Sequence, residues 1–425
     1  MRRILIILVL ALAALAAWGA FSFHASLKDW WRPPIAPRGD AAAFIVSIRE
    51  MTADHHGAIA VQLVEGGQPS GAFYASPGAP VNGDTRFQVA SLSKWATAIG
   101  VMRLVEEGRI ELDAPVTRYL TRWTLPPSNF PAEQVTVRRV LSHTAGLTDG
   151  LAYAGYLPGQ AIQSLEASLT QASDADPGVD GRTRAGAKAG AFRYSGGGYT
   201  LLQLMIEEVS GETFDAYMKR AVFEPLGMAH SSFLLTAAEE AARAPTFEAD
   251  GRVAPQRLYT ATGAASLYTT TNDLARLIAA HGPGAAPPPL EPQTLASMRE
   301  PHAKQLGLPI WGLGLVLYAP NGQGGSIIGH DGSNRPAINT SARVDPATGD
   351  GVAVLVTGDI RLASQIAGEW VRWKTGEADI ISFVMAGRRN LTFFGIGAGL
   401  ILAMTVLALW RPWRRGSGGP SEAGA

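Results

Sequence analysis

The chain has 425 residues, of which 47% are hydrophobic and 17% charged, and it contains no cysteine. Its 36 basic residues balance its 36 acidic residues, which argues against a generic nucleic-acid binder. The lack of cysteine excludes a disulfide framework, a thiolate nucleophile and a thiolate zinc site, so a covalent nucleophile would have to be an oxygen or an amine.

Both ends of the chain carry a long apolar run without charge, Ile4 to Phe23 and Leu391 to Trp410. As a helix, each run of 20 residues spans about 30 Å, the hydrocarbon thickness of a bilayer. We predict an N-terminal anchor in residues 1–25 and a transmembrane helix over residues 391–410. Ala14-Leu15-Ala16 is a possible signal-peptide cleavage site, but the apolar run continues past it and favours an uncleaved anchor.

The flanking arginines orient these segments. Arg2 and Arg3 precede the first, and three arginines follow the second within the tail 411–425, so the positive-inside rule places both termini in the cytoplasm. Arg388 and Arg389 before the second segment weaken this assignment. We expect a cell-membrane protein whose central part lies on the extracytoplasmic, periplasmic side. Its predicted divisions are a linker 26–40, a globular domain 41–376 and a juxtamembrane linker 377–390.

Between the two apolar runs, helical and strand patterns alternate irregularly. Residues 41–51 predict a helix, and residues 57–64 and 71–75 predict two strands joined by a Gly-Gly turn. Further predicted elements are helices over 91–108, 135–141 and 199–209, an insertion or lid over 161–190, a proline-rich loop over 285–290, and strands over 311–317 and 352–356. Helices mixed with hairpin-like strands indicate an α+β fold.

The first candidate for chemistry is Ser91-Leu92-Ser93-Lys94. At the start of a helix, residues three apart lie on one face, so a lysine amine could take the proton of the serine hydroxyl if its pKa is lowered. Backbone N–H groups at the helix N-terminus could also stabilise a developing oxyanion. The alternative is an exposed lysine beside a capping serine.

Two further motifs follow along the chain. Tyr194-Ser195-Gly196 precedes a predicted helix, and a tyrosine can act as a general base when cations lower its pKa; the alternative is an ordinary half-buried tyrosine. His330-Asp331-Gly332-Ser333 lies between strand-like stretches, where the glycine would let a substrate approach the strand edge; the alternative is a plain Asp-Gly turn.

Other classes of enzyme lack their motifs in this sequence. No G-x-S-x-G nucleophile elbow, H-E-x-x-H metal site, Walker A loop or dinucleotide-binding glycine fingerprint occurs. We therefore expect no metal and no cofactor.

In order and spacing, the three motifs resemble those of the serine β-lactamase and penicillin-binding-protein superfamily, in particular the branch of class C β-lactamases, D-alanyl-D-alanine carboxypeptidases and related esterases. Supporting phrases are Leu141 to Leu147 (LSHTAGL), Pro225 to Met228 (PLGM), Trp311 to Gly314 (WGLG) and Gly329 to Gly332 (GHDG). The resemblance covers about residues 41–359. It implies an antiparallel sheet flanked by helices, with a helical subdomain and the site between them.

The resemblance also implies roles for individual residues. Ser91 would be acylated, Lys94 would share its proton network, and Tyr194 would activate Ser91 and then protonate the leaving group. The N–H groups of Ser91 and Ser333 would form the oxyanion hole. His330 and Gly332 would line the site, and His143 would be structural.

One residue departs from the family pattern. Gly196 stands where the family has an asparagine that touches the lysine and the amide carbonyl of the substrate. A glycine cannot make these contacts, so an ester, or a substrate held by other contacts, is favoured over a β-lactam or a peptide. The sequence therefore predicts a membrane-tethered serine hydrolase that acts on a small-molecule or peptide substrate. The alternatives are a non-catalytic binding or signalling protein with the same fold and, less favoured, an envelope scaffold.

Overall fold

The computed structural model describes residues 2–149, 153–186, 190–284, 290–305 and 307–411. The chain forms two compact units, Met1–Pro33 with Ser382–Ala425, and Pro34–Ile381. The helices are α1 (Arg2–Leu27), α2 (Ala41–Met51), α3 (Ser93–Glu106), α4 (Val137–Leu141), α5 (Leu165–Thr170), α6 (Gly196–Ser210), α7 (Phe214–Met218), α8 (Ala237–Ala241), α9 (Thr262–Ala265), α10 (Thr271–Ala279), α11 (Pro292–Met298), α12 (Leu362–Thr375), α13 (Ile380–Met385) and α14 (Gly387–Trp410), with the short turns η1 (Ala90–Leu92), η2 (Val116–Tyr119), η3 (Ala132–Gln134) and η4 (Lys219–Phe223).

The larger unit is built on a sheet of eight strands in the order β2-β1-β10-β9-β8-β7-β6-β5, in which every neighbouring pair is antiparallel. A second, two-stranded sheet joins β3 to β4. The strands are β1 (Ile59–Glu65), β2 (Gln68–Ala75), β3 (Phe87–Gln88), β4 (Tyr268–Thr269), β5 (Ala303–Gln305), β6 (Leu308–Trp311), β7 (Val316–Pro320), β8 (Ser326–Asn334), β9 (Ile338–Asp345) and β10 (Asp350–Thr357).

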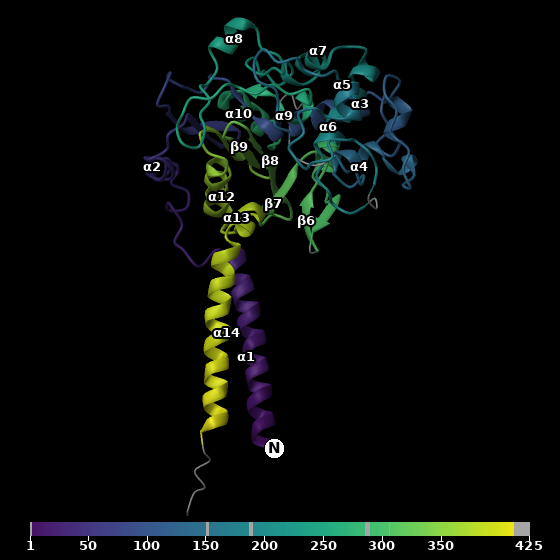
Figure 1. Cartoon of the computed structure of the whole chain (residues 1–425). Coiled ribbons are helices and arrows are strands. Elements are labelled where there is room, and N and C mark those ends of the chain that lie inside the picture. The colour runs from purple at the N-terminus through teal and green to yellow at the C-terminus, as the bar shows by residue number, and fades with distance from the viewer. Residues whose placement is uncertain (1, 150–152, 187–189, 285–289, 306, 412–425) are drawn as a thin grey trace, which may run out of the picture. The chain divides into compact units, whose positions relative to one another are not determined.

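Strands β1, β9 and β10 of the large sheet are buried on both faces. Along β10, Val352 and Val354 pack into one hydrophobic cluster and Ala353 and Leu355 into another, as the two-residue period of a strand requires. The first cluster includes residues of α2 and α12, and the second includes residues of α3, α6 and α10. Figure 1 shows α12 on one side of β8 and β9, and α3 and α6 on the other side. Burial on both faces explains why β1 and β10 are mostly apolar.

Most elements agree with the sequence patterns. The helix over 41–51, the hairpin of β1 and β2 and the strand within 352–356 are confirmed, and Gly66 and Gly67 at the hairpin turn both have positive φ. The helix predicted over 199–209 is α6, which begins earlier, at Gly196, and ends at Gly211 with φ +76°. Within 161–190 the described residues hold the short helix α5, and residues 285–289 of the predicted proline-rich loop lie outside the described residues.

The single strand predicted over 311–317 is wrong. The chain leaves β6 at Trp311, turns through residues 312–315 and returns in β7 from Val316. Gly314 in this turn has φ +78°, and a Cβ there would lie 2.0 Å from Cβ of Ala98 on α3. The turn therefore needs glycine both for its conformation and for its close approach to α3.

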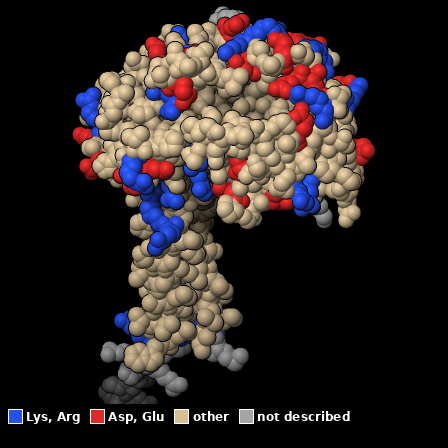
Figure 2. All heavy atoms as spheres, turned by 45° about the horizontal axis from the view of Figure 1, so that its top comes forward, with Lys and Arg blue, Asp and Glu red and all other residues tan. Residues whose placement is uncertain are grey.

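The smaller unit contains α1 and α14, two helices long and apolar enough to cross a membrane. The two helices pack antiparallel. Arg3, at the start of α1, donates hydrogen bonds of 2.9 Å to the carbonyls of Ala408 and Arg411 at the end of α14. Trp18 donates to the carbonyl of Phe394 at 2.9 Å and lies against Gly397, where a Cβ would clash with the indole ring. Figure 2 shows charge at the ends of the pair and none along most of its length.

Candidate active site

Ser91 lies in a strained turn at the start of α3. The helix predicted from residue 91 begins at Ser93, and Ser91 belongs to the preceding turn η1. Ala90 has φ +49°, a conformation that residues other than glycine rarely adopt. Ser93 holds the turn, since its hydroxyl donates to the carbonyl of Ala90 at 2.6 Å and accepts from the N–H of Leu267 at 2.8 Å. Ser91 itself stays partly exposed and can reach a substrate.

Lys94 lies one helical turn on and is buried, with 2% of its surface exposed. Its Nζ donates to Oγ of Ser91 at 3.1 Å and to the carbonyl of Ala264 on α9 at 2.7 Å. Burial lowers the pKa of Lys94 from 10.5 to about 7, and the charge of Asp149 opposes that shift. A lysine with this pKa exchanges its proton near neutral pH, unlike the exposed lysine of the alternative interpretation.

Tyr194 lies beside the same amine. Nζ of Lys94 is 4.9 Å from the centroid of the tyrosine ring. Burial raises the pKa of Tyr194, and a side-chain hydrogen bond with Ser91 acts in the opposite direction. Tyr194 is therefore a neutral phenol at neutral pH, which can donate a proton more readily than it can accept one.

Aromatic side chains pack against the ring of Tyr194. The imidazole of His143 stacks on its ring at 4.2 Å, and Trp311 contacts both His143 and His330, with centroids 4.8 and 5.3 Å apart. Nδ1 of His143 accepts from the N–H of Ser195 at 3.1 Å, so His143 holds the segment that carries Tyr194. Burial lowers the pKa of His143 well below its ordinary value, and it lowers that of His330 to about 4, so both rings are neutral at neutral pH.

Strand β8 brings the third motif to the turn that carries Ser91. A Cβ on Gly332 would lie 2.2 Å from the carbonyl oxygen of Val89, two residues before Ser91. Thr340 on β9 donates to the same carbonyl at 2.7 Å. Only glycine permits this approach, and the next residue along the strand, Ser333, is exposed. His330 lies farther in, 6.5 Å from the ring of Tyr194.

A buried ion network fixes β8 on its other face. Arg343 on β9 is fully buried and pairs with Asp379 and, at 3.3 Å, with Asp331 of the third motif. Its guanidinium lies 4.0 Å from the ring centroid of Tyr318, whose hydroxyl donates to Asp331 at 2.8 Å. Asp379 lies just before the end of the larger unit at Ile381. The network thus ties the strand of the site to the last residues of that unit.

The sequence motifs did not reveal Asp149 and Tyr153. Asp149 is buried, accepts from the N–H of Gly197 at 2.8 Å, and receives a hydrogen bond from the hydroxyl of Ser195. Tyr153 donates to the same carboxylate at 3.4 Å, and its ring lies against Gly196. Asp149 follows the LSHTAGL phrase by two residues, but no local pattern shows that it folds onto residues 195–197.

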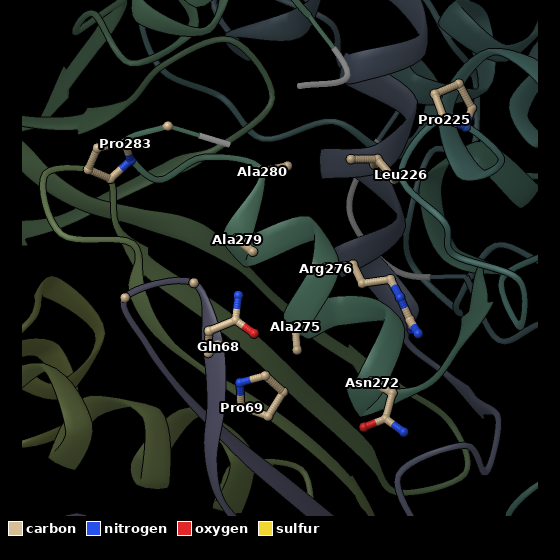
Figure 3. A pocket seen from close by; sticks show the side chains of 13 residues that line it. Gln68, Pro69, Pro225, Leu226, Asn272, Ala275, Arg276, Ala279, Ala280 and Pro283 are labelled. Atoms are coloured by element: carbon tan, nitrogen blue, oxygen red, sulfur yellow. The ribbon is translucent and has the colours of Figure 1, made fainter. Parts of the chain in front are cut away.

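A cavity of about 730 Å³ lies elsewhere, between the β1–β2 turn and α10, and contains none of the predicted site residues. Figure 3 shows Gln68 and Pro69 on the hairpin side and Asn272 and Arg276 on the helix. Arg276 pairs with Asp273 at 2.9 Å, and Asn272 donates to Asp84 at 2.8 Å, so these two polar side chains already have partners. None of the described residues that line the cavity carries a hydroxyl or an amine that could serve as a nucleophile.

Comparison with known proteins identifies the family of this chain. The Beta-lactamase family profile matches residues 47–377. PbpX of Bacillus subtilis (strain 168) is 29% identical over 45% of this chain and 44% of its own length, and Esterase EstB of Burkholderia gladioli is 28% identical over 56% of this chain and 68% of its own length. The chain thus spans less than half of PbpX.

Solved structures show the same fold. The octameric penicillin-binding protein homologue from Pyrococcus abyssi aligns with a TM-score of 0.65 and 27% identity, over 78% of this chain and 77% of its own. The D-alanine carboxypeptidase AmpC from Burkholderia cenocepacia aligns with a TM-score of 0.60 and 20% identity, over 78% of this chain and 99% of its own. The expected α+β fold is confirmed, and the chain belongs to the β-lactamase family of serine hydrolases.

Proposed function

We propose that this protein is a membrane-tethered serine hydrolase that forms an acyl-enzyme on Ser91. The observation that carries the proposal is the contact of 3.1 Å between Oγ of Ser91 and the buried amine of Lys94. A serine hydroxyl becomes a useful nucleophile only when a neighbouring base takes its proton, and an amine with a pKa of about 7 is half deprotonated at neutral pH.

The steps follow from the neighbours of Ser91. Its oxygen attacks the substrate carbonyl while its proton passes to Lys94, and the N–H groups of Ser91 and Ser333 stabilise the oxyanion. Tyr194 donates its proton to the leaving oxygen or nitrogen, and the Lys94 ammonium restores that proton. A water molecule then attacks the carbonyl of the acyl-enzyme and gives a proton to the amine of Lys94. The bond between the acyl group and Oγ of Ser91 breaks, and the Lys94 ammonium returns that proton to Oγ, which releases the acid and regenerates both side chains. In this scheme Lys94, rather than Tyr194, is the base.

We propose an ester as the preferred substrate. Gly196 offers no side-chain amide to bind an amide group of the substrate, and EstB, which carries the name esterase, is among the relatives. A cell-wall peptide or a β-lactam is the second candidate, supported by the likeness to a penicillin-binding protein homologue.

The anchoring of the enzyme belongs to the same proposal. Retention of α1 is supported by the packing of Trp18 and Arg3 on α14, which a cleaved signal peptide would lose. Arg389, one of the two arginines that weaken the predicted orientation, pairs with Asp29. This pairing offsets charge at that end of the helix pair, so the proposal places both termini in the cytoplasm and Pro34–Ile381 outside.

Hydrolysis of p-nitrophenyl butyrate by the detergent-solubilised full chain tests the catalytic proposal. Ser91→Ala should abolish turnover, and Ser128→Ala, at an exposed serine away from the site, should leave it unchanged. Wild-type protein that neither turns over this ester nor forms a covalent adduct would favour the non-catalytic binding protein.

A further inference from the structure

Tyr153 occupies the space that a side chain at position 196 would need. A Cβ built on Gly196 would lie 2.5 Å from Cε2 of Tyr153 and 3.4 Å from both Cδ2 and Cζ. No real Cβ tolerates the first of these distances, so the glycine and the tyrosine ring are complementary. Gly196 has no positive φ, hence its backbone does not itself require glycine.

Buried polar contacts hold the Tyr153 ring in this place. Its hydroxyl donates to Oδ2 of Asp149 at 3.4 Å, and its backbone forms a bridge with Ala175. Asp149 is bound in turn to the start of α6, through the N–H of Gly197 and the hydroxyl of Ser195. Tyr153 is therefore fixed to the helix N-terminus that immediately follows Tyr194.

We propose that Tyr153 determines substrate specificity: its ring, packed against Gly196 beside the segment that carries Tyr194, forms a wall on which the acyl group of the substrate lies, and this wall selects esters with an apolar acyl group over acyl groups that carry an amide. The inference rests on the proposed hydrolase function. An aromatic ring offers apolar contact area, and its hydroxyl is already bound to Asp149. An amide held against the ring would lose its water without gaining a partner, which costs about tenfold or more in affinity.

A double-mutant cycle tests the geometry without reference to activity. Gly196→Ala should lower the midpoint of urea unfolding in the wild-type background, because its methyl group meets the ring. The same substitution should have little or no effect in Tyr153→Ala protein, where the space is free. Equal effects of Gly196→Ala in the two backgrounds would overturn the complementarity.

Kinetics on two substrates test the specificity. We expect Tyr153→Ala to raise the ratio of kcat/KM for nitrocefin, a β-lactam with an amide-bearing acyl group, to kcat/KM for p-nitrophenyl butyrate by about tenfold. Tyr153→Phe keeps the ring and should keep the wild-type ratio. Tyr153→Ala/Gly196→Asn, which restores an amide side chain in the free space, should raise the ratio further.

Covalent labelling of Ser91 by a fluorophosphonate, measured in every variant, distinguishes failure of the specificity inference from failure of the hydrolase proposal. If Ser91 is labelled and the substrate ratio does not move in Tyr153→Ala, the specificity inference is wrong and the hydrolase proposal stands. If Ser91 is not labelled even in wild-type protein, the hydrolase proposal fails and the inference fails with it.

Discussion

The amine of Lys94 donates at once to the hydroxyl of Ser91 and to the main-chain carbonyl of Ala264, at 3.1 and 2.7 Å. The carbonyl fixes the direction of the amine, and burial makes its charged form costly. Together, the two contacts and the burial direct an amine with a lowered pKa toward Oγ of Ser91. In the proposed mechanism, the burial that costs stability is what gives this amine its reactivity.

The lowered pKa of Lys94 predicts the pH profile. Below about pH 7 the amine is protonated and cannot accept the serine proton, so kcat/KM for an ester should rise with pH and reach half its plateau near pH 7. His330, with a pKa of about 4, is already neutral in this range. His330→Gln should therefore keep the same midpoint even if its plateau is lower. A profile that is flat between pH 5.5 and 8.5 would contradict the role of Lys94.

The Arg343 network predicts an effect on the stability of the larger unit. Asp379→Asn removes one of the two carboxylates that neutralise a fully buried guanidinium, so it should destabilise the larger unit by at least about 2 kcal/mol. Tryptophan fluorescence during urea unfolding of the full chain measures this. Asp250→Asn, in an exposed pair with Arg252, is the matched control and should leave the midpoint unchanged. Equal midpoints for the two variants would show that Asp379 does not stabilise the unit.

The close approach at Gly332 predicts a catalytic effect. A methyl group there would push β8 away from the carbonyl of Val89 and so displace the N–H of Ser333 from the oxyanion. We expect Gly332→Ala to lower kcat/KM by about 10²–10³-fold, the usual cost of losing one oxyanion donor. Gly325→Ala, just before the same strand, meets only the side chain of Asn321 at 3.3 Å or more and should keep activity. A fully active Gly332→Ala enzyme would exclude this strand from the oxyanion hole.

The absence of native cysteine allows a direct test of topology. Arg252→Cys, at a side chain that is 76% exposed in the larger unit, should react with a membrane-impermeant maleimide added to intact cells with a permeable outer envelope. Ser421→Cys in the tail should react only after the inner membrane is opened. Labelling in the reverse order would invert the proposed orientation.

Much of the fold could be predicted from periodicity and glycine placement, because these signals are local. The Gly66-Gly67 turn and the glycine at the end of α6 are examples. The break of the strand at Trp311 was missed, since it depends on the approach of Gly314 to α3, a contact between distant segments.

In the candidate site, too, the sequence predicts local relationships but not contacts between distant segments. Ser91 and Lys94 are three residues apart, and spacing alone places them together. Tyr153 reaches Gly196 only through tertiary folding, so the sequence shows a glycine where the family has an asparagine but not the ring that fills the space. The pKa of Lys94 likewise depends on burial, which a motif does not reveal.

The most direct test of the central claim is the intact-protein mass of the full chain after incubation with a fluorophosphonate and, separately, with a penicillin, beside the Ser91→Ala variant. The account predicts a single phosphonate adduct on wild-type protein and none on the variant, with weaker labelling by the penicillin or none. An unmodified wild-type mass with both reagents, or an adduct that persists in Ser91→Ala, would contradict an activated nucleophile at Ser91.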